Sequence, residues 1–324
     1  MIHEIEPEIY SPTFINKRAA GEDFALIYRG NRVFAYIEDG KVRLPLFKDL
    51  KELPATPEDY ERALNNGYYL FEISGKNYFL AEVATDAFPE IADKEELSRT
   101  AKDRAGRFFF FMNINKFREL LSKDEMFHDG SHGAEHSPMV PVVFAAATGN
   151  HMAWWKRSRR FCGFCGAECV PSETERAMVC PSCGNIEYPK ISPAVIVAII
   201  KKGETPEEDR LLLVRNNYGS YRKLALVAGF VEIGESFEQA IHREVFEEVG
   251  LKVKKLKYYK NQPWGLSYAQ MIGFTAELEG SDEIHLQESE LSEGGWYLRE
   301  EVPDNPFRLS VGNEMIHQFR EGKI

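Results

Sequence analysis

Short apolar segments alternate with turn-forming residues over roughly the first eighty positions, a pattern typical of antiparallel strands. Gly30-Asn31 and Asp39-Gly40 separate three of these segments and are typical of hairpin turns. Ser74-Gly75 separates two more. The pattern predicts strands over Phe24–Arg29, Val33–Glu38, Val42–Leu46, Tyr68–Ile73 and Tyr78–Val83.

Helical spacing appears between and after these strands. Thr56-Pro57-Glu58 predicts a helix start, because Thr caps a helix and Pro suits its first position. Further helices are predicted over Glu95–Ala105, Ile114–Leu121 and Pro141–Ser158, and the apolar run Phe108–Phe111 predicts a buried strand. We therefore predict an N-terminal α+β domain over residues 1–157.

The last third of the chain has a different pattern. Pro193–Lys201 is almost continuously apolar and Arg210–Arg215 is a second apolar run, as expected for buried strands. A helix is predicted from Ser236, which can cap it, with Glu238 near the positive end of its dipole. These elements predict an α/β domain over residues 191–324.

Composition narrows the class of protein. The 324 residues are 44% hydrophobic and 28% charged, which is ordinary for a globular protein, and the net charge of −11 argues against sequence-independent binding of nucleic acid. No apolar run is long enough to span a membrane, and the acidic N-terminus lacks a secretory apolar segment. We expect a cytoplasmic protein.

All five cysteines lie close together, between Cys162 and Cys183. Two CxxC pairs, separated by fourteen residues, can complete a tetrahedral four-cysteine zinc site, and its ligands are predicted to be Cys162, Cys165, Cys180 and Cys183. With all four positions filled the zinc is structural, one ion per chain, in a zinc ribbon over residues 158–190. Cys169 lies outside the pattern. Redox chemistry is the less favoured interpretation.

The basic and aromatic segment Trp155–Arg160 precedes this ribbon. Such a segment can bind RNA phosphates and bases. It can equally be a solvated helix end whose cations suit the dipole, and we favour that interpretation.

A long spaced motif carries the chemistry. Gly229, Glu235 and the segment Arg243–Leu251 fit the pattern Gx5Ex7REUxEExGU, with U an aliphatic residue. On a helix, Glu244, Glu247 and Glu248 share one face, and like charges this close favour bound cations. Hard oxygen ligands predict Mg²⁺ or Mn²⁺. The competing interpretation, a solvated acidic face, does not explain the other constrained positions.

The flanking residues of the motif are predicted to shape the same site. Arg243 can pair with Glu235 and hold the preceding loop against the helix. Gly229 and Gly250 are expected to allow backbone turns at the two ends of the motif.

At this point the sequence resembles the Nudix superfamily, and specifically its NADH pyrophosphatase family. An N-terminal domain, a four-cysteine ribbon and a Nudix domain follow one another in the family, and this chain has the same order over nearly its full length. The family also carries an array near SQPWPFPxS beyond the motif. Here Gln262-Pro263-Trp264 is kept, but Gly265-Leu266-Ser267 replaces Pro-Phe-Pro.

The resemblance implies an α/β/α sandwich with a mixed sheet, and a homodimer. It implies that Glu290 completes the carboxylate set of Glu244, Glu247 and Glu248. The substrate-binding residues that it implies are Tyr188, Ile196, Phe230, Gln262, Trp264 and Gly312.

The expected activity is metal-dependent hydrolysis of the pyrophosphate of NADH or NAD⁺ to nicotinamide mononucleotide and AMP, including NAD that caps RNA. Glu244 and Glu248, assisted by Glu247 and Glu290, are expected to hold the cations. Two alternatives remain: a Nudix hydrolase for another nucleoside diphosphate derivative such as ADP-ribose, and a nucleotide-sensing module that binds RNA.

Overall fold

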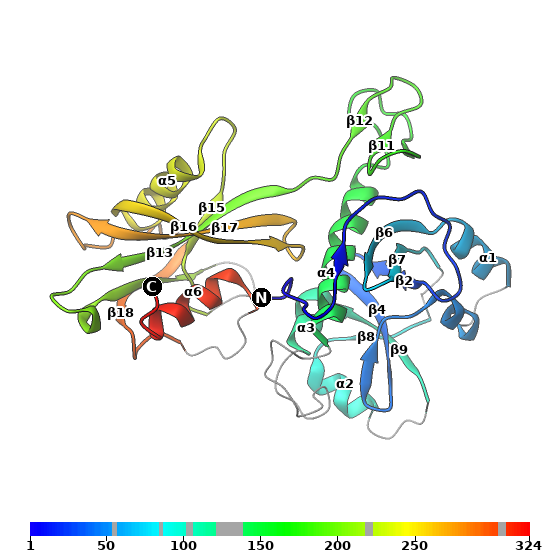
Figure 1. The fold of residues 1–324 in the computed structure, drawn as a ribbon, viewed down its shortest axis with the longest axis horizontal. Helices are drawn as coiled ribbons and strands as arrows, with labels where there is room; N and C mark the ends of the chain where they lie inside the picture. The colour runs from blue at the N-terminus through cyan, green and yellow to red at the C-terminus, as the bar shows by residue number, and fades with distance from the viewer. Residues whose placement is uncertain (54–56, 84–86, 102–105, 121–138, 218–222, 304–308) are drawn as a thin grey trace. The chain divides into compact units, whose positions relative to one another are not determined.

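The computed structural model describes every residue except 54–56, 84–86, 102–105, 121–138, 218–222 and 304–308 (Figure 1). The chain divides into two compact units. The first comprises Ile2–Lys190 and Gly265–Tyr268, and the second comprises Met1, Ile191–Trp264 and Ala269–Ile324. No helix among the described residues is long and apolar enough to cross a membrane.

Two sheets form most of the first unit. One has the order β1-β6-β7-β2, and the other has the order β3-β4-β9-β8 with β5 paired to β4. Their strands are β1 (Tyr10–Ser11), β2 (Phe24–Leu26), β3 (Tyr28–Arg29), β4 (Arg32–Glu38), β5 (Lys41–Arg43), β6 (Tyr68–Ile73), β7 (Lys76–Leu80), β8 (Glu90–Ile91) and β9 (Phe108–Asn113). The helices are η1 (Phe47–Glu52), α1 (Pro57–Asn65), α2 (Lys94–Ala101), α3 (Ile114–Glu119) and α4 (Met139–Ser158).

The predicted strand Phe24–Arg29 is in fact two strands in different sheets. β2 pairs with β7 in parallel, whereas β3 pairs with β4 in antiparallel fashion. At the break, the Ile27 carbonyl accepts from Phe34 N at 2.9 Å, so the chain changes sheets without losing this hydrogen bond. The other predicted elements of this unit are present, although Thr56, residues 102–105 and Leu121 lie outside the described residues.

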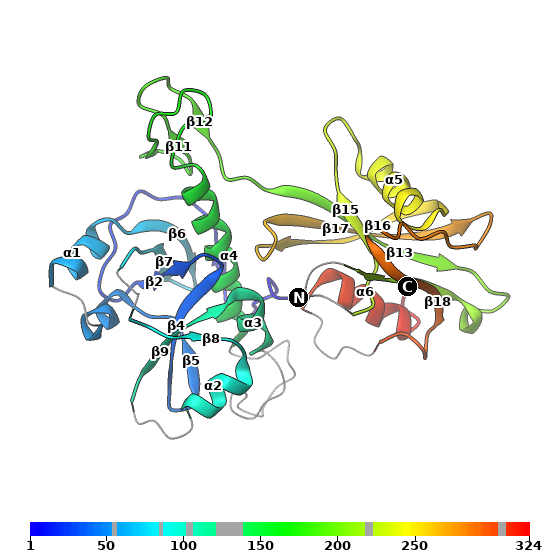
Figure 2. The same cartoon turned by 180° about the vertical axis from the view of Figure 1, so that it is seen from behind.

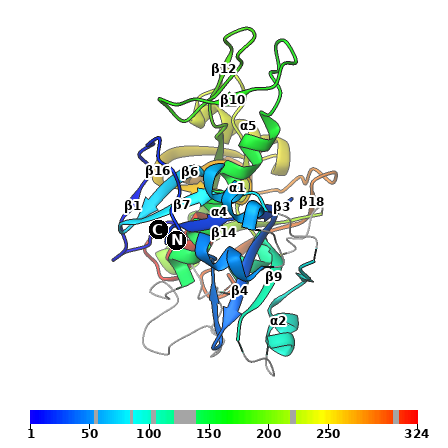
Figure 3. The ribbon, with the colours of Figure 1, turned by 90° about the vertical axis from the view of Figure 1, so that its right-hand side faces the viewer.

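The zinc ribbon follows α4 in the same unit. Its three short strands, β10 (Val170–Pro171), β11 (Met178–Val179) and β12 (Ile186–Glu187), form an antiparallel sheet in that order (Figure 3). Cations at the end of α4 pair with ribbon carboxylates: Arg159 with Glu187 at 3.3 Å and Arg160 with Glu168 at 3.1 Å. This pairing favours the structural interpretation of the basic segment over RNA binding.

The second unit is built on one mixed sheet. Its order is β16-β17-β13-β14-β18, with β15 also paired to β13, and the β13–β17 pair is parallel. The elements are β13 (Ser192–Lys201), η3 (Pro206–Glu208), β14 (Arg210–Asn216), β15 (Val227–Phe230), α5 (Phe237–Val249), β16 (Lys252–Trp264), β17 (Ala269–Glu279), β18 (Leu291–Leu298) and α6 (Val311–Arg320). The two predicted buried strands are confirmed as β13 and β14.

Helices α5 and α6 cover opposite faces of this sheet (Figures 1 and 2). Alternate residues of β13 explain the arrangement. Val195, Val197 and Ile199 belong to the core cluster beneath α5, whereas the neighbouring Ile196 and Ala198 belong to the cluster beneath α6. A strand that is buried on both faces has no polar face, which is why the sequence over β13 is continuously apolar.

Helix α5 has well-defined ends. Ser236 Oγ accepts from Gln239 N at 3.3 Å, and Gln239 Oε1 accepts from Ser236 N at 2.8 Å, so the two residues form a capping box. At the other end Gly250 has φ of +70°, and its N–H donates to the Phe246 carbonyl. The predicted cap at Ser236 is confirmed.

We expect Gly250→Ala to destabilise this unit more than Gly280→Ala does. Both glycines have positive φ, but a Cβ at position 250 would lie 2.9 Å from His285 Cβ, whereas one at position 280 meets nothing within 4 Å. The left-handed conformation alone should cost about 1–2 kcal/mol, and the collision should add to it. Denaturant unfolding of both variants measures the difference, and equal losses would contradict this explanation.

Candidate active site and zinc centre

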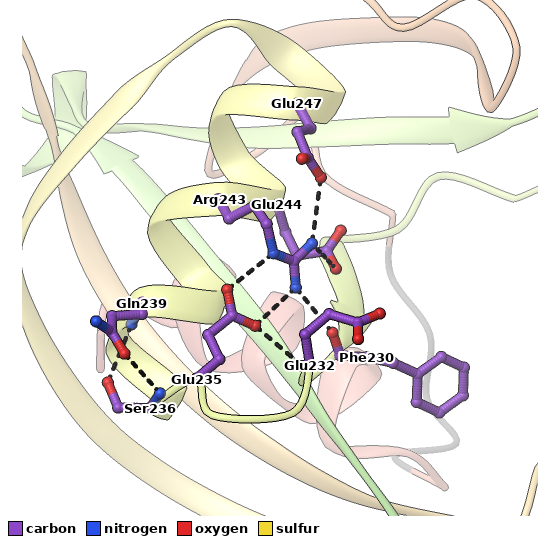
Figure 4. A network of polar contacts seen from close by, with 8 residues as sticks. All are labelled: Phe230, Glu232, Glu235, Ser236, Gln239, Arg243, Glu244 and Glu247. Carbon is purple, nitrogen blue, oxygen red and sulfur yellow. Dashed lines mark hydrogen bonds and ion pairs between the residues drawn. The ribbon is translucent and has the colours of Figure 1, made fainter.

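The Arg243 guanidinium is the centre of a polar network at the start of α5 (Figure 4). Its Nε and Nη2 donate to the two carboxylate oxygens of Glu235, at 2.8 and 2.9 Å. Its Nη1 donates to Glu244 at 2.8 Å and to Glu247 at 3.2 Å. Nη2 also donates to the Phe230 carbonyl at 3.0 Å. The predicted Arg243–Glu235 pair is confirmed, and one side chain joins the strand, the loop and the helix.

The loop before α5 is fixed by the same carboxylate. Glu235 accepts from Glu232 N at 3.0 Å, and Gly234 supplies a left-handed turn with φ of +87°. Hydrogen bonds from Arg243, and then from the Glu232 backbone, lower the pKa of Glu235 to about 2. Glu235 therefore stays ionised at neutral pH and is committed to holding Arg243.

Gly229 provides space for the carboxylate of Glu244. A Cβ at this position would overlap the carboxyl carbon and both oxygens of Glu244. Gly229 lies within β15 and its φ is not positive, so the turn expected here from the sequence is wrong. Its role is steric. Because Gly229 has no side chain, the carboxylate of Glu244 can pack directly against strand β15.

Glu248 is the most buried of the four carboxylates, with 6% of its surface exposed. Burial, and then the charges of Glu244, Glu290 and Glu247, raise its pKa to about 8. Burial also raises the pKa of Glu244, although Arg243 opposes this. The charge of Glu290 acts on both Glu244 and Glu248, although Glu290 lies forty-two positions after Glu248 in the sequence.

A short segment after β17 brings Glu290 to this position. His285 N donates to the Val249 carbonyl and Gln287 N donates to the Glu248 carbonyl, both at 2.9 Å. These bonds satisfy carbonyls that the last turn of α5 leaves without partners. Glu290 N then donates to the Gln287 carbonyl at 2.9 Å, which closes a turn beside the helix.

The donor chemistry of the carboxylate set suits a hard divalent cation. Glu248 is buried, yet among the described residues no basic side chain pairs with it. A buried carboxylate without a cation either takes up a proton or binds a metal. Glu244, Glu247, Glu248 and Glu290 offer oxygen ligands only, as Mg²⁺ and Mn²⁺ prefer.

Three of the residues predicted to bind substrate lie on the opposite, α6 side of the sheet. Ala194 faces Phe230 and Ile196 faces Ala228 across the β13–β15 ladder, so Ile196 and Phe230 point to the same side. A Cβ at Gly312, in the first turn of α6, would lie 2.8 Å from Ile196 Cδ1. Phe230 is half exposed, and its ring points away from Arg243 (Figure 4).

The other three are placed differently. Gln262 is fully buried in β16, and its amide bonds to the backbone of residues 309 and 311. Trp264 is the last residue of β16. Tyr188 belongs to the first unit, where it is 55% exposed and its hydroxyl donates to Glu175 at 3.4 Å. The roles of all six residues in substrate binding stay predictions.

The four predicted zinc ligands come together in the ribbon. All four Sγ atoms lie within 4.8 Å of one another, with Cys162 and Cys183 3.7 Å apart and Cys165 and Cys180 3.4 Å apart. Zinc–sulfur bonds of about 2.3 Å in a tetrahedron place sulfurs about 3.8 Å apart, so the arrangement fits zinc. Gly166 N donates to the Cys162 carbonyl and Gly184 N to the Cys180 carbonyl, each at 2.9 Å, which closes both turns.

Comparisons with known proteins agree with this geometry. Residues 191–318 match the NUDIX domain, and residues 157–188 match the NADH pyrophosphatase zinc ribbon domain. An NAD-capped RNA hydrolase NudC of Chromobacterium violaceum is 34% identical over 214 residues, which cover 64% of this chain and 78% of that protein. A protein of the same name from Shigella flexneri is 40% identical over 177 residues, 55% of this chain and 66% of that protein.

A solved structure is also similar. The crystal structure of a NUDIX hydrolase from Nitrosomonas europaea has a TM-score of 0.38 and 26% sequence identity, and the match covers 50% of this chain and 91% of that one.

We expect Cys180→Ser to lose zinc and Cys169→Ser to retain it. Cys180 is one of the four clustered thiols, whereas Cys169 is buried nearby but outside the cluster. Mass spectrometry of metals should find about one zinc ion per chain in the wild type and in Cys169→Ser. Loss of zinc from both variants, or from neither, would contradict the assignment of ligands.

We also expect Glu248→Gln to stabilise the protein at pH 9 but not at pH 4.5, in buffer without added magnesium or manganese. The pKa of Glu248 is raised to about 8 in the folded state, so folding stability falls as pH rises from the unfolded value of about 4.5 through 8. Glutamine avoids that loss, and the unfolding temperature at pH 9 should rise on the order of 5 °C. The exposed Glu238, changed to Gln, is the control; a pH-independent shift in Glu248→Gln would refute the explanation.

Proposed function

The chain belongs to the Nudix hydrolases that carry the NADH pyrophosphatase zinc ribbon, and we propose that it hydrolyses the pyrophosphate bond of NADH and NAD⁺ to nicotinamide mononucleotide and AMP. The observation that carries the proposal is the complete carboxylate set on and beside α5, with Glu248 buried and no basic partner among the described residues. Such a set is suited to a substrate that carries two phosphates and is bound through divalent cations.

Each residue of the site has a distinct task in this proposal. Glu244 and Glu248 are the ligands that bind the cations directly, because both are largely buried. Both also have raised pKa values, which a bound cation would lower again. When bound, the divalent cations neutralise the pyrophosphate and activate a water molecule. Arg243 does not bind substrate; its donors are already directed at three glutamates and a carbonyl, so it positions the ligands.

We assign the acceptor of the water proton to Glu290 in preference to Glu247. Glu247 accepts from Arg243 Nη1 at 3.2 Å, so its carboxylate is already engaged by a cation. Among the described residues, the Glu290 carboxylate accepts only a weak 3.5 Å contact from Gln287 Nε2. Its position beside the helix carboxylates suits a general base in the same site.

NAD at the 5′ end of RNA is included in the proposed substrates. The relatives with 34% and 40% identity are named NAD-capped RNA hydrolases, and the same pyrophosphate bond is present in the cap. ADP-ribose is the second candidate substrate, favoured by Gly265-Leu266-Ser267 in the specificity array. A purely nucleotide-sensing module has no need of the full carboxylate set, so we place it last.

Three finer expectations belong to the same proposal. The catalytic cation is Mg²⁺ or Mn²⁺, supported by the all-oxygen ligand set. The enzyme is a homodimer, which the family resemblance supports. Its location is the cytoplasm, supported by a cysteine cluster that is arranged for metal rather than for disulfides.

The test is mass spectrometry of products after incubation with NADH, NAD⁺, ADP-ribose and NAD-capped RNA in parallel, with Mg²⁺ or Mn²⁺. We expect the mononucleotide and AMP from the dinucleotides, and a loss of about a hundredfold or more in kcat/KM for Glu248→Gln. Glu238→Gln, an exposed position on the same helix, should retain wild-type turnover. Cleavage of ADP-ribose alone would select the second candidate, and wild-type turnover in Glu248→Gln would reject the proposed site.

A further inference from the structure

The segment that carries Glu290, residues 280–290 between β17 and β18, is attached to the strand that follows it. Trp296 Nε1 donates to the Asp282 carbonyl at 3.0 Å. Leu286 packs closely on β18, since a Cβ added to Gly294 would lie 2.7 Å from Leu286 Cδ2. The first part of the segment therefore has a fixed course before the chain reaches Glu290.

Gln287 is the residue at which this segment meets helix α5. Its N–H donates to the Glu248 carbonyl at 2.9 Å. Its carbonyl accepts from Glu290 N and from Leu291 N, both at 2.9 Å. One residue thus bonds to the backbone of Glu248 and closes the turn that presents Glu290, so the turn takes its position from the end of α5.

Asn217, the residue after β14, holds the same turn through two further bonds. Its N–H donates to the Glu290 carbonyl at 2.8 Å, and its side-chain Nδ2 donates to the Glu288 carbonyl. The register of the β14–β18 ladder shifts between Arg215 and Asn216, immediately before this contact. Because such a shift interrupts the ladder, the Asn217 side chain supplies a bond where regular strand pairing is lost.

Electrostatic repulsion makes these backbone bonds necessary. The charge of Glu290 raises the pKa of both Glu244 and Glu248, so the carboxylates repel one another when they are ionised. Arg243 is bonded to Glu244 and offsets this repulsion on the helix. Among the described residues, the Glu290 carboxylate accepts only a weak 3.5 Å contact from Gln287, so its position depends on the backbone of its turn.

We propose that Asn217 is a positioning residue for Glu290: its bonds to the carbonyls of Glu288 and Glu290 fix the turn that presents the Glu290 carboxylate to the attacking water. The inference rests on the proposed function, in which Glu290 accepts the proton of that water. Asn217 acts through the backbone of the turn and is not itself a catalytic residue.

The experiment compares Asn217→Leu with Ser292→Ala. Leucine has the same branching as asparagine but cannot donate to the Glu288 carbonyl. Ser292 Oγ donates to the Arg215 carbonyl at 3.2 Å, a bond of the same kind between the same two strands but outside the turn, so Ser292→Ala is a matched control. Steady-state kinetics with NADH and Mn²⁺, and the folded fraction by circular dichroism, are measured for both. Amide exchange of residues 288–291 is measured in protein without substrate or added cation.

We expect Asn217→Leu to lower kcat about tenfold or more and to change KM by less than about threefold, because a displaced base slows the chemical step without removing a contact to the substrate. Amide exchange of residues 288–291 should become faster, and Ser292→Ala should match the wild type in both measurements. An unchanged kcat, unchanged exchange, a change confined to KM, or an equal loss in Ser292→Ala would overturn the proposal. A fall in kcat that only parallels a loss of folded protein would overturn it as well.

A second variant covers the case in which Asn217→Leu does not fold. Asn217→Ala removes the same donor without adding apolar surface, and an unchanged kcat in that variant would overturn the proposal equally. Wild-type protein that cleaves no dinucleotide would instead reject the proposed function, and the exchange measurement would still show whether Asn217 holds the turn.

Discussion

The concentration of negative charge on one side of α5 is the constraint on which the second unit depends. Four glutamates and Glu235 lie near one another, and a single guanidinium, that of Arg243, contacts three of the five. Isolated carboxylates in such a place would be protonated or would repel one another. The structure keeps them together because Arg243 also bonds to the Phe230 carbonyl, which ties the charged helix to the central sheet. Glu248 and Glu290 are the two that Arg243 does not contact.

The sheet separates two tasks. The side beneath α5 holds the carboxylates that we propose to bind cations, and the side beneath α6 holds Ile196, Phe230 and Gly312. Strand β15 belongs to both, since Gly229 faces Glu244 while Phe230, the next residue, points away from it. Side chains alternate between the two faces of a strand. Neighbouring residues of β15 therefore face the side with the carboxylates and the side expected to hold the nucleotide.

Much of the chemistry could be predicted from the sequence, because it depends on local spacing. The carboxylates at i, i+3 and i+4 on α5, the cap at Ser236 and the two CxxC pairs are all set by residues within a few positions of one another. What depended on distant contacts could not be predicted. The bond from Gln262 to Val311 spans forty-nine positions, and the division of the predicted strand at Ile27 follows from pairing with β7 and β4. Gly229 was identified correctly as constrained, but only the position of Glu244 reveals that the constraint is space rather than a turn.

The packing of Glu244 against Gly229 also limits which substitutions can be tolerated at position 229 during evolution. Every missense change of a glycine codon adds at least a Cβ, and here the first added carbon already occupies the volume of the carboxylate. No gradual series of substitutions exists at this position, because alanine, the smallest step, meets the same obstacle as any larger residue. Gly166 and Gly184 of the ribbon differ, since they have open space around them and only a left-handed backbone to satisfy, which asparagine also adopts. Lineages that retain the hydrolase should therefore vary at the ribbon glycines long before they vary at Gly229.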